Sequence, residues 1–219
     1  HHAKHLFGSW KLSHAMLPYA ALVLALVIWS VAWGVNGRAL SANRLLLGAV
    51  AQHPEGITKN LAYFKEAIAI GAFGTQEARE QLTQGTMQIA RATAASADVK
   101  QQFYTLAVEE MQAQAKESPL DARFPLFLGM VQQAFGDDDD AAISLQKALE
   151  LSPKKQGIMF ELARNAQLRG KDAEMLEYFR RAYELEMKNL NARLYYAAAL
   201  IAAGRTTEGE ALLAPYVES

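Results

Sequence analysis

Three glycines in the C-terminal half of this chain stand 34 residues apart: Gly136, Gly170 and Gly204. Pro119 and Pro153 keep the same spacing. Self-similarity at a fixed period of about 20–50 residues is typical of proteins built from stacked repeats. Each repeat of this kind is amphipathic and buries its apolar side only by stacking on its neighbours. The period therefore predicts a stack of similar units.

Each 34-residue unit, counted from Ala122, has a large apolar residue at its seventh position and a small one at its eighth. In the first unit these are Leu128 and Gly129. We expect the small residue to let the first helix of a unit lie close against the second. The repeated Gly then ends the first helix, because Gly adopts the left-handed conformation needed there without steric cost. Pro153 ends the second helix, since its ring blocks continuation.

These positions resemble the tetratricopeptide repeat (TPR) family over residues 119–219. The residues of the first unit that match the family pattern are Leu128, Gly129, Gly136, Ala141, Leu145, Ala148 and Pro153. The resemblance implies an all-α fold, an α-solenoid of helix pairs. Its units would lie at about 122–155, 156–189 and 190–219.

The later units depart from the family pattern. The second has Met175 where Ala is usual and Met187 where Pro is usual. The third has Gly209 and Pro215 in its second helix. Both residue types disfavour a helix interior, so we expect that this helix is short or that the chain has been cut there.

The region from 36 to 118 is expected to be helical, with a degenerate repeat pattern. A unit counted from residue 41 would place four residues at family positions: Leu47, Gly48, Phe64 and Ala67. Thr75, followed by Gln76 and Glu77, is typical of a helix start with Thr as the N-cap. No segment alternates with period two over the length of a strand, so we predict no sheet.

An uncharged apolar run of 20 residues, Met16 to Val35, precedes the repeats. At about 1.5 Å per residue, a helix of this length spans about 30 Å, the thickness of the hydrocarbon core of a bilayer. Tyr19 lies near one end, and Trp29 and Trp33 lie toward the other, as interfacial aromatic residues do. We predict a transmembrane helix over 16–35 with residues 1–15 as its flank. A buried core helix and a cleaved signal peptide are the alternatives.

The charges beside this run leave its orientation open. Lys4 and Lys11 on one side balance Arg38 and Arg44 on the other, so the positive-inside rule gives a tie. Protonated histidines in the N-terminal flank would favour a cytoplasmic N-terminus, and thus repeats on the extracytoplasmic face. The chain begins with His1 rather than Met, so we expect a fragment or a processed product.

Composition excludes several classes of site and partner. The chain has no Cys, so it holds neither a disulfide nor a thiolate metal site. All 23 acidic residues follow residue 54, together with 18 of the 22 basic ones, so the body of the chain is acidic. A nucleic-acid-binding protein needs a basic surface that displaces counterions. We therefore expect no nucleic-acid partner.

No motif predicts catalysis, a cofactor or a metal site. The run Asp137 to Asp140 lacks the alternate spacing of a calcium loop and is expected to cap a helix and interact with its dipole. His1 and His5 lie four residues apart but lack a third ligand. The segment 71–74 lacks the Lys and the Ser or Thr of a phosphate loop. We expect a chain with no enzymatic activity of its own.

The TPR resemblance also implies a binding surface, because the first helices of TPR units line a concave groove that binds a peptide. The groove-facing positions would be the second, fifth, ninth and twelfth of each unit. The expected groove residues are Arg123, Leu126, Met130, Gln133, Phe160, Arg164, Gln167, Asn191, Leu194 and Ile201. Arg123 and Arg164 would pair with acidic groups or with the C-terminal carboxylate of a protein or peptide ligand. The alternative is an ordinary solvated surface.

The order of features further resembles the C-terminal tail of bacterial O-antigen ligase/polymerase-like membrane proteins, over residues 16–215. The matching segments are 35–38, 60–67, 76–79 and 119–123. In that family a multi-helix membrane part, which this chain lacks, carries out glycan transfer. Two hypotheses follow. The chain is a membrane-anchored TPR scaffold of a bacterial envelope system, in the plasma (inner) membrane, or it is the non-catalytic tail of an enzyme of the envelope-glycan assembly machinery.

Overall fold

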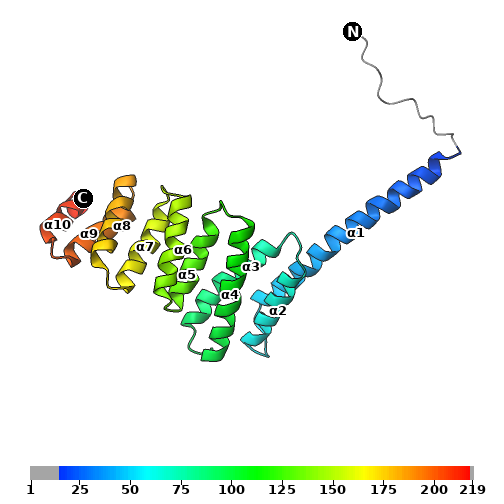
Figure 1. Ribbon diagram of the computed structural model, residues 1–219, viewed down its shortest axis with the longest axis horizontal. Coiled ribbons are helices and arrows are strands. Elements are labelled where there is room, and N and C mark those ends of the chain that lie inside the picture. Colours follow the sequence, from blue (N-terminus) through cyan, green and yellow to red (C-terminus); the bar gives the residue numbers. More distant parts are fainter. Residues whose placement is uncertain (1–14, 218–219) are drawn as a thin grey trace, which may run out of the picture.

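The computed structural model describes residues 15–217, and over this range the chain is helical, without a strand (Figure 1). The helices form an elongated stack that runs from α1 to α10. Their bounds are α1 (Leu17–Val50), α2 (Ile57–Ala69), α3 (Thr75–Arg91), α4 (Ala97–Glu117), α5 (Arg123–Ala134), α6 (Asp138–Leu151), α7 (Gln156–Leu168), α8 (Asp172–Leu185), α9 (Leu190–Ala202) and α10 (Thr206–Val217). The predicted all-α fold, a solenoid of helix pairs, is confirmed over these residues, and the predicted transmembrane helix corresponds to one long apolar helix, α1.

Neighbouring helices pack in pairs, and the pairs stack. α5 packs on α6, α7 on α8 and α9 on α10, while α6 against α7 and α8 against α9 join successive pairs. The buried apolar side chains accordingly form several clusters along the stack. One, which includes Leu82 and Phe103, holds α1 to α5 together, and another, which includes Leu145 and Ile158, joins α6 to α7 and α8. A repeat stack buries its apolar faces in this distributed way because each unit contacts only its neighbours.

The three repeated glycines end the first helices of the C-terminal pairs, as predicted. Gly136, Gly170 and Gly204 have φ angles of 86°, 68° and 77°, in the left-handed region. At each site the glycine amide bonds to the carbonyl three residues earlier, and the next amide bonds to the carbonyl five residues before it. These two bonds make a Schellman motif, which pairs carbonyls that the end of the helix would otherwise leave without partners.

A small residue lets the two helices of a pair lie in close contact. A Cβ at Gly129 of α5 would lie 2.6 Å from Leu145 Cγ and 3.1 Å from the carbonyl oxygen of Ala141 in α6. In the third pair a Cβ at Gly209 of α10 would lie 2.6 Å from Ile201 Cγ1 in α9. Gly209 is therefore a packing residue, and α10, with 12 residues, is two residues shorter than α6 and α8.

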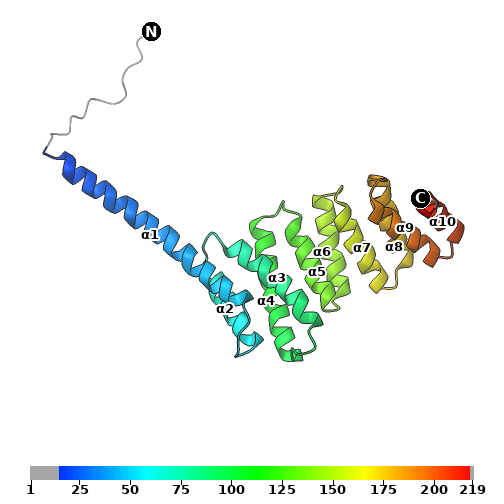
Figure 2. The same ribbon diagram turned by 180° about the vertical axis from the view of Figure 1, so that it is seen from behind.

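α1 is longer than the apolar run that predicts a membrane helix. It continues without a break to Val50, for 34 residues in all. Its last turns belong to the repeat stack, since Ala42 and Ala49 are buried there and α1 packs on α2 and α3. The apolar run and the first helix of the stack are thus one continuous helix (Figure 2).

The first half of α1 packs on no other described element. Every residue from 15 to 34 is exposed, and the helix projects away from the stack (Figures 1 and 2). By length and composition α1 can cross a membrane, a test that a signal sequence or a soluble core helix also meets. A core helix is mostly buried, whereas none of the apolar window of α1 is buried.

Two local expectations for the degenerate region are corrected. Phe64 and Ala67 are buried, but Leu47, at a position where the family packs an apolar residue, is exposed. α3 begins at Thr75, and its N-cap is Gly74, one residue before the expected cap. Thr75 Oγ1 instead donates a hydrogen bond of 2.8 Å to a carbonyl in the preceding turn.

Candidate peptide-binding surface

The ten expected groove residues lie on α5, α7 and α9, the first helices of the C-terminal pairs. α5 contacts both α3 and α7, so these helices lie side by side along one face of the stack. Six of the ten side chains are exposed: Arg123, Arg164, Gln167, Asn191, Leu194 and Ile201. Leu126, Met130 and Phe160 are half-buried, and Gln133 is buried, with 6% of its surface exposed.

Phe160 packs against two neighbouring aromatic rings. Its ring centroid lies 5.4 Å from that of Tyr195, edge to face, and 6.4 Å from that of Phe179. Phe179 and Tyr195 are themselves 5.6 Å apart. The three rings come from α7, α8 and α9, and such pairs contribute about 0.5–1.5 kcal/mol each beyond their area burial. Phe160 therefore helps to join the second unit to the third.

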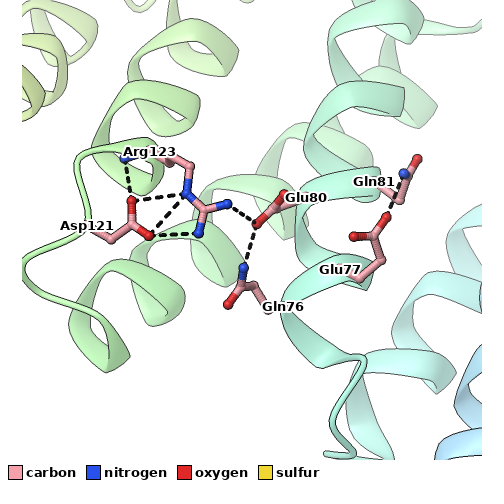
Figure 3. A network of polar contacts seen from close by, with 6 residues as sticks. All are labelled: Gln76, Glu77, Glu80, Gln81, Asp121 and Arg123. Atoms are coloured by element: carbon pink, nitrogen blue, oxygen red, sulfur yellow. Dashed lines mark hydrogen bonds and ion pairs between the residues drawn. The ribbon is translucent and has the colours of Figure 1, made fainter. Parts of the chain in front are cut away.

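Arg123, the first residue of α5, is held by acidic residues of its own chain (Figure 3). Its Nε and Nη2 donate to Asp121, at 3.1 and 2.8 Å to Oδ2, and its Nη1 lies 3.8 Å from Glu80 Oε1 on α3. The hydrogen bonds from Arg123 lower the pKa of the Asp121 carboxyl below its ordinary value of 3.8 and raise the pKa of Arg123. Gln76 also donates to Glu80, at 2.9 Å. Arg123 thus bridges α3 and α5 while more than half of its side chain stays exposed.

Arg164 of α7 and two apolar residues of α9 are also partly exposed. Arg164 lies 3.6 Å from Glu161, one turn earlier on α7, a long ion pair between partly exposed groups. On α9, Leu194 and Ile201 are 43% and 40% exposed. They are seven residues apart, with the exposed Ala198 between them, so they share one face of the helix. This face is a short exposed apolar stripe.

A cavity of about 670 Å³ lies where the α4–α5 and α6–α7 connections meet. It is lined by two of the expected groove residues, Arg123 and Leu126. It also contains residues that sequence reasoning missed, namely Leu120, which is 87% exposed, and Lys155, at the N-cap of α7. The Lys155 ammonium is exposed and makes no ion pair or hydrogen bond within residues 15–217. The site combines apolar surface with Lys155 and with an Arg123 that is already paired to Asp121, which also lines the cavity. The unpaired Lys155 suits an apolar segment that carries a carboxylate.

A second cavity, of about 660 Å³, lies between the end of α1, α2, α3 and α4. Phe64 and Phe103 form part of its wall, and the exposed Gln84 and Gln88 lie at its rim. Its lining contains no Asp, Glu, Lys or Arg. His53 and Asn60 also line it, but both bond to carbonyls at the end of α1, so they serve to cap that helix.

The acidic run from 137 to 140 has a structural role at the start of α6. Asp137 is at the N-cap position, without a side-chain capping bond, and the next three residues form the first turn. Asp139 forms an ion pair of 2.9 Å with Arg169, the C-cap of α7, and Asp137 accepts a hydrogen bond from Tyr104 of α4. In the part of the chain described, no three His, Asp or Glu side chains gather as a metal site. His1 and His5 lie outside the described residues.

Several solved structures share the fold of this chain. TTC0263, a thermophilic TPR protein of Thermus thermophilus, is 25% identical and matches 84% of this chain and 97% of its own, with a TM-score of 0.57. Two MamA structures are 13% and 14% identical, with TM-scores of 0.58 and 0.56. They cover 81% and 74% of this chain, and 91% and 86% of their own.

No protein-family model and no curated protein matches the sequence. None of the structures reported above supports the resemblance to O-antigen ligase-like proteins, which stays a hypothesis from the sequence. The 34-residue period, the glycine-ended helices and the stacked pairs agree with the TPR structure that matches most of this chain. The chain therefore has the fold of a tetratricopeptide-repeat protein.

Proposed function

We propose that this chain is a scaffold anchored in a bacterial plasma membrane, which binds a peptide segment of a partner protein through its TPR stack. The observation that carries the proposal is α1, half of which is bare and apolar while the other half is built into the stack. Bare apolar surface costs about 25 cal/mol per Å² in water, so a helical segment whose apolar residues are all exposed, as from 17 to 34, is expected to lie in a non-aqueous environment. A bilayer provides it at the right thickness.

Flotation of the full-length chain with lipid vesicles tests the anchor. We expect the protein to float with the vesicles and to resist extraction at alkaline pH. Val23→Arg combined with Val27→Arg places two charges at mid-span, and each costs about 2.5–3.5 kcal/mol of insertion free energy, so the double variant should stay in the soluble fraction. Leu120→Arg is the matched control, because it adds a charge at an exposed apolar residue of the stack. Equal flotation of the double variant and the control would refute the anchor.

The peptide site that we propose centres on the 670 Å³ cavity, with Lys155 as its available cation. Arg123 is already shared between Asp121 and Glu80, so a ligand carboxylate would gain most from Lys155. Leu120 and Leu126 offer apolar surface beside it. The α9 stripe of Leu194 and Ile201 extends the surface along the same series of first helices. This arrangement favours a ligand with apolar side chains and an acidic group or a free C-terminus.

Selection from a phage-displayed library of peptides rich in Leu, Asp and Glu identifies a probe, and fluorescence anisotropy measures its affinity. We expect Lys155→Glu to weaken binding at least about tenfold, since a charge-assisted hydrogen bond contributes about 1.5–3 kcal/mol. Lys154→Glu is the matched control, because Lys154 is also exposed and is one residue away but does not line the cavity. Equal effects of the two variants would show that only the net charge of the surface matters.

The partner's compartment depends on the face of the membrane that carries the stack. The chain has no Cys, so a single cysteine in the stack reports this face directly. Leu120→Cys is suitable, because the side chain is 87% exposed. Labelling of intact cells by an impermeant maleimide would place the stack on the extracytoplasmic side, and labelling only after lysis would place it in the cytoplasm.

A further inference from the structure

The connection between α2 and α3, residues 70–74, folds back against α1. Arg38 of α1 donates a hydrogen bond from its guanidinium to the carbonyl of Ile70. A Cβ at Gly74 would lie 3.1 Å from Asn43 Oδ1 of α1, so this end of the connection also lies against the helix. In both overall views the connection lies beside α1 (Figures 1 and 2). These contacts therefore fix the position of the connection along the axis of α1.

Phe73, at the tip of this connection, is 89% exposed. It shares a hollow of about 360 Å³ with Gly34 and Arg38 of α1. A single exposed apolar side chain is common on soluble proteins and has no meaning alone. The position of Phe73 distinguishes it, because Gly34 is the last but one residue of the uncharged run and Arg38 is the first charge after it.

The position of Phe73 along the axis of α1, beside the end of the apolar run, corresponds to the interfacial layer of a bilayer that the run spans. Gly34 and Arg38 are one turn apart, about 6 Å along the axis. Each interfacial layer between the hydrocarbon core and water is about 5–7 Å thick. Aromatic rings are enriched in this layer, and arginine side chains reach into it with their charge toward the headgroups. Residues 70–74 contain no acidic side chain that would oppose contact with anionic lipid.

We propose that Phe73 inserts into the lipid headgroup–acyl boundary and forms a second contact of the chain with the bilayer, beside the span. This inference rests on the proposed anchor. A single helix leaves a domain free to tilt and to rotate about the helix axis. A second contact on one side of that helix removes these motions, so the TPR stack is held in one orientation toward the membrane.

Site-directed spin labels on the full-length chain in phosphatidylcholine–phosphatidylglycerol vesicles test this contact. Single-cysteine variants Leu24→Cys, Ala72→Cys and Leu120→Cys each carry one nitroxide, and collision rates with oxygen and with a water-soluble nickel chelate give its depth. We expect the label at 24 in the hydrocarbon core, the label at 72 at headgroup depth and the label at 120 in water. A label at 72 as exposed to nickel as the label at 120 overturns the contact.

The variants separate this contact from the anchor on which it rests. A label at 24 in water means that the anchor itself fails, and the second contact fails with it. A label at 24 in lipid with a label at 72 in water leaves the anchor intact and refutes the contact alone. Adding Phe73→Ser to Ala72→Cys should raise nickel accessibility several-fold. Leu120→Ser in the same background removes an equally exposed apolar side chain away from α1 and should leave the accessibility unchanged; equal effects of the two serines would also refute the contact.

Discussion

Asn189 donates a hydrogen bond of 2.7 Å from Nδ2 to Oε1 of Gln156, the first residue of α7. Gln156 in turn donates to the carbonyl of Ala182, also at 2.7 Å. The Oδ1 of Asn189 accepts from the amides of Asn191 and Ala192, at 3.0 and 3.3 Å, and so caps α9. One polar chain therefore joins the start of α7, the end of α8 and the start of α9.

This series of hydrogen bonds predicts different outcomes for two substitutions at Asn189. Asn189→Ala removes the cap and the bond to Gln156, and we expect a loss of about 1–2 kcal/mol of unfolding free energy. Asn189→Asp keeps an oxygen that caps the helix but loses the N–H donor, so it should cost less. Hydrogen exchange at the amides of Asn191 and Ala192 measures the local effect. Faster exchange in Asn189→Ala alone supports the cap, and unchanged exchange in both variants contradicts it.

Close packing at Gly129 predicts that a single methyl group destabilises the α5–α6 pair. The new Cβ would lie 2.6 Å from Leu145 Cγ, so Gly129→Ala should cost about 1–3 kcal/mol despite the better helix propensity of Ala. Gly85→Ala in α3 is the control, because its Cβ would meet nothing within 4 Å. We expect that substitution to be neutral or to stabilise by up to about 1 kcal/mol. Urea unfolding followed by circular dichroism compares the two, and a similar midpoint for both would contradict the packing argument.

Arg79 is a nearly buried cation whose removal should destabilise the α3–α4 contact. Its guanidinium donates to Glu110 at 2.9 Å, Gln114 at 2.8 Å and Glu117 at 2.8 Å. Removing one partner of a buried pair costs about 3–5 kcal/mol. Because Glu117 is exposed and Glu110 partly so, we expect about 2–3 kcal/mol for Arg79→Ala in chemical denaturation. Arg91→Ala, at an exposed site in the same helix, should change stability by no more than about 0.5 kcal/mol.

The raised pKa of the Tyr104 phenol predicts a loss of stability at alkaline pH. Burial and the hydrogen bond that it donates to Asp137 raise the pKa of its phenol well above the ordinary value of 10.0. The folded state then holds this proton more tightly than the unfolded state, so the stabilisation is complete below about pH 10 and is lost as pH rises from there toward the folded-state pKa. Tyr104→Phe should cost about 1 kcal/mol at neutral pH and weaken the alkaline decline. Parallel declines in both proteins would exclude Tyr104 as the cause.

Much of the fold can be predicted because its signals are local. The 34-residue spacing of Gly136, Gly170 and Gly204 reports where helices end, since the left-handed conformation is a property of the residue itself. The pairing of a small residue with an apolar one, as at Gly129, reports a close contact within one unit. The site is less predictable. Family positions identify exposed residues such as Leu194, but they also include Gln133, which is buried, and Phe160, which packs on two other rings.

The repeat period, the residue types that end helices and the uncharged run thus specified the class of fold, the ends of its first helices and the bare apolar segment, because each can be read from the order of residues in the chain. The angles at which successive pairs stack depend on how many side chains interdigitate at once, which no local pattern encodes. Those angles place Glu80 beside Arg123, bring Lys155 and Leu120 to one cavity, and set Phe73 beside Gly34. These juxtapositions, on which the proposed binding site and the second membrane contact rest, arise only when the units pack together.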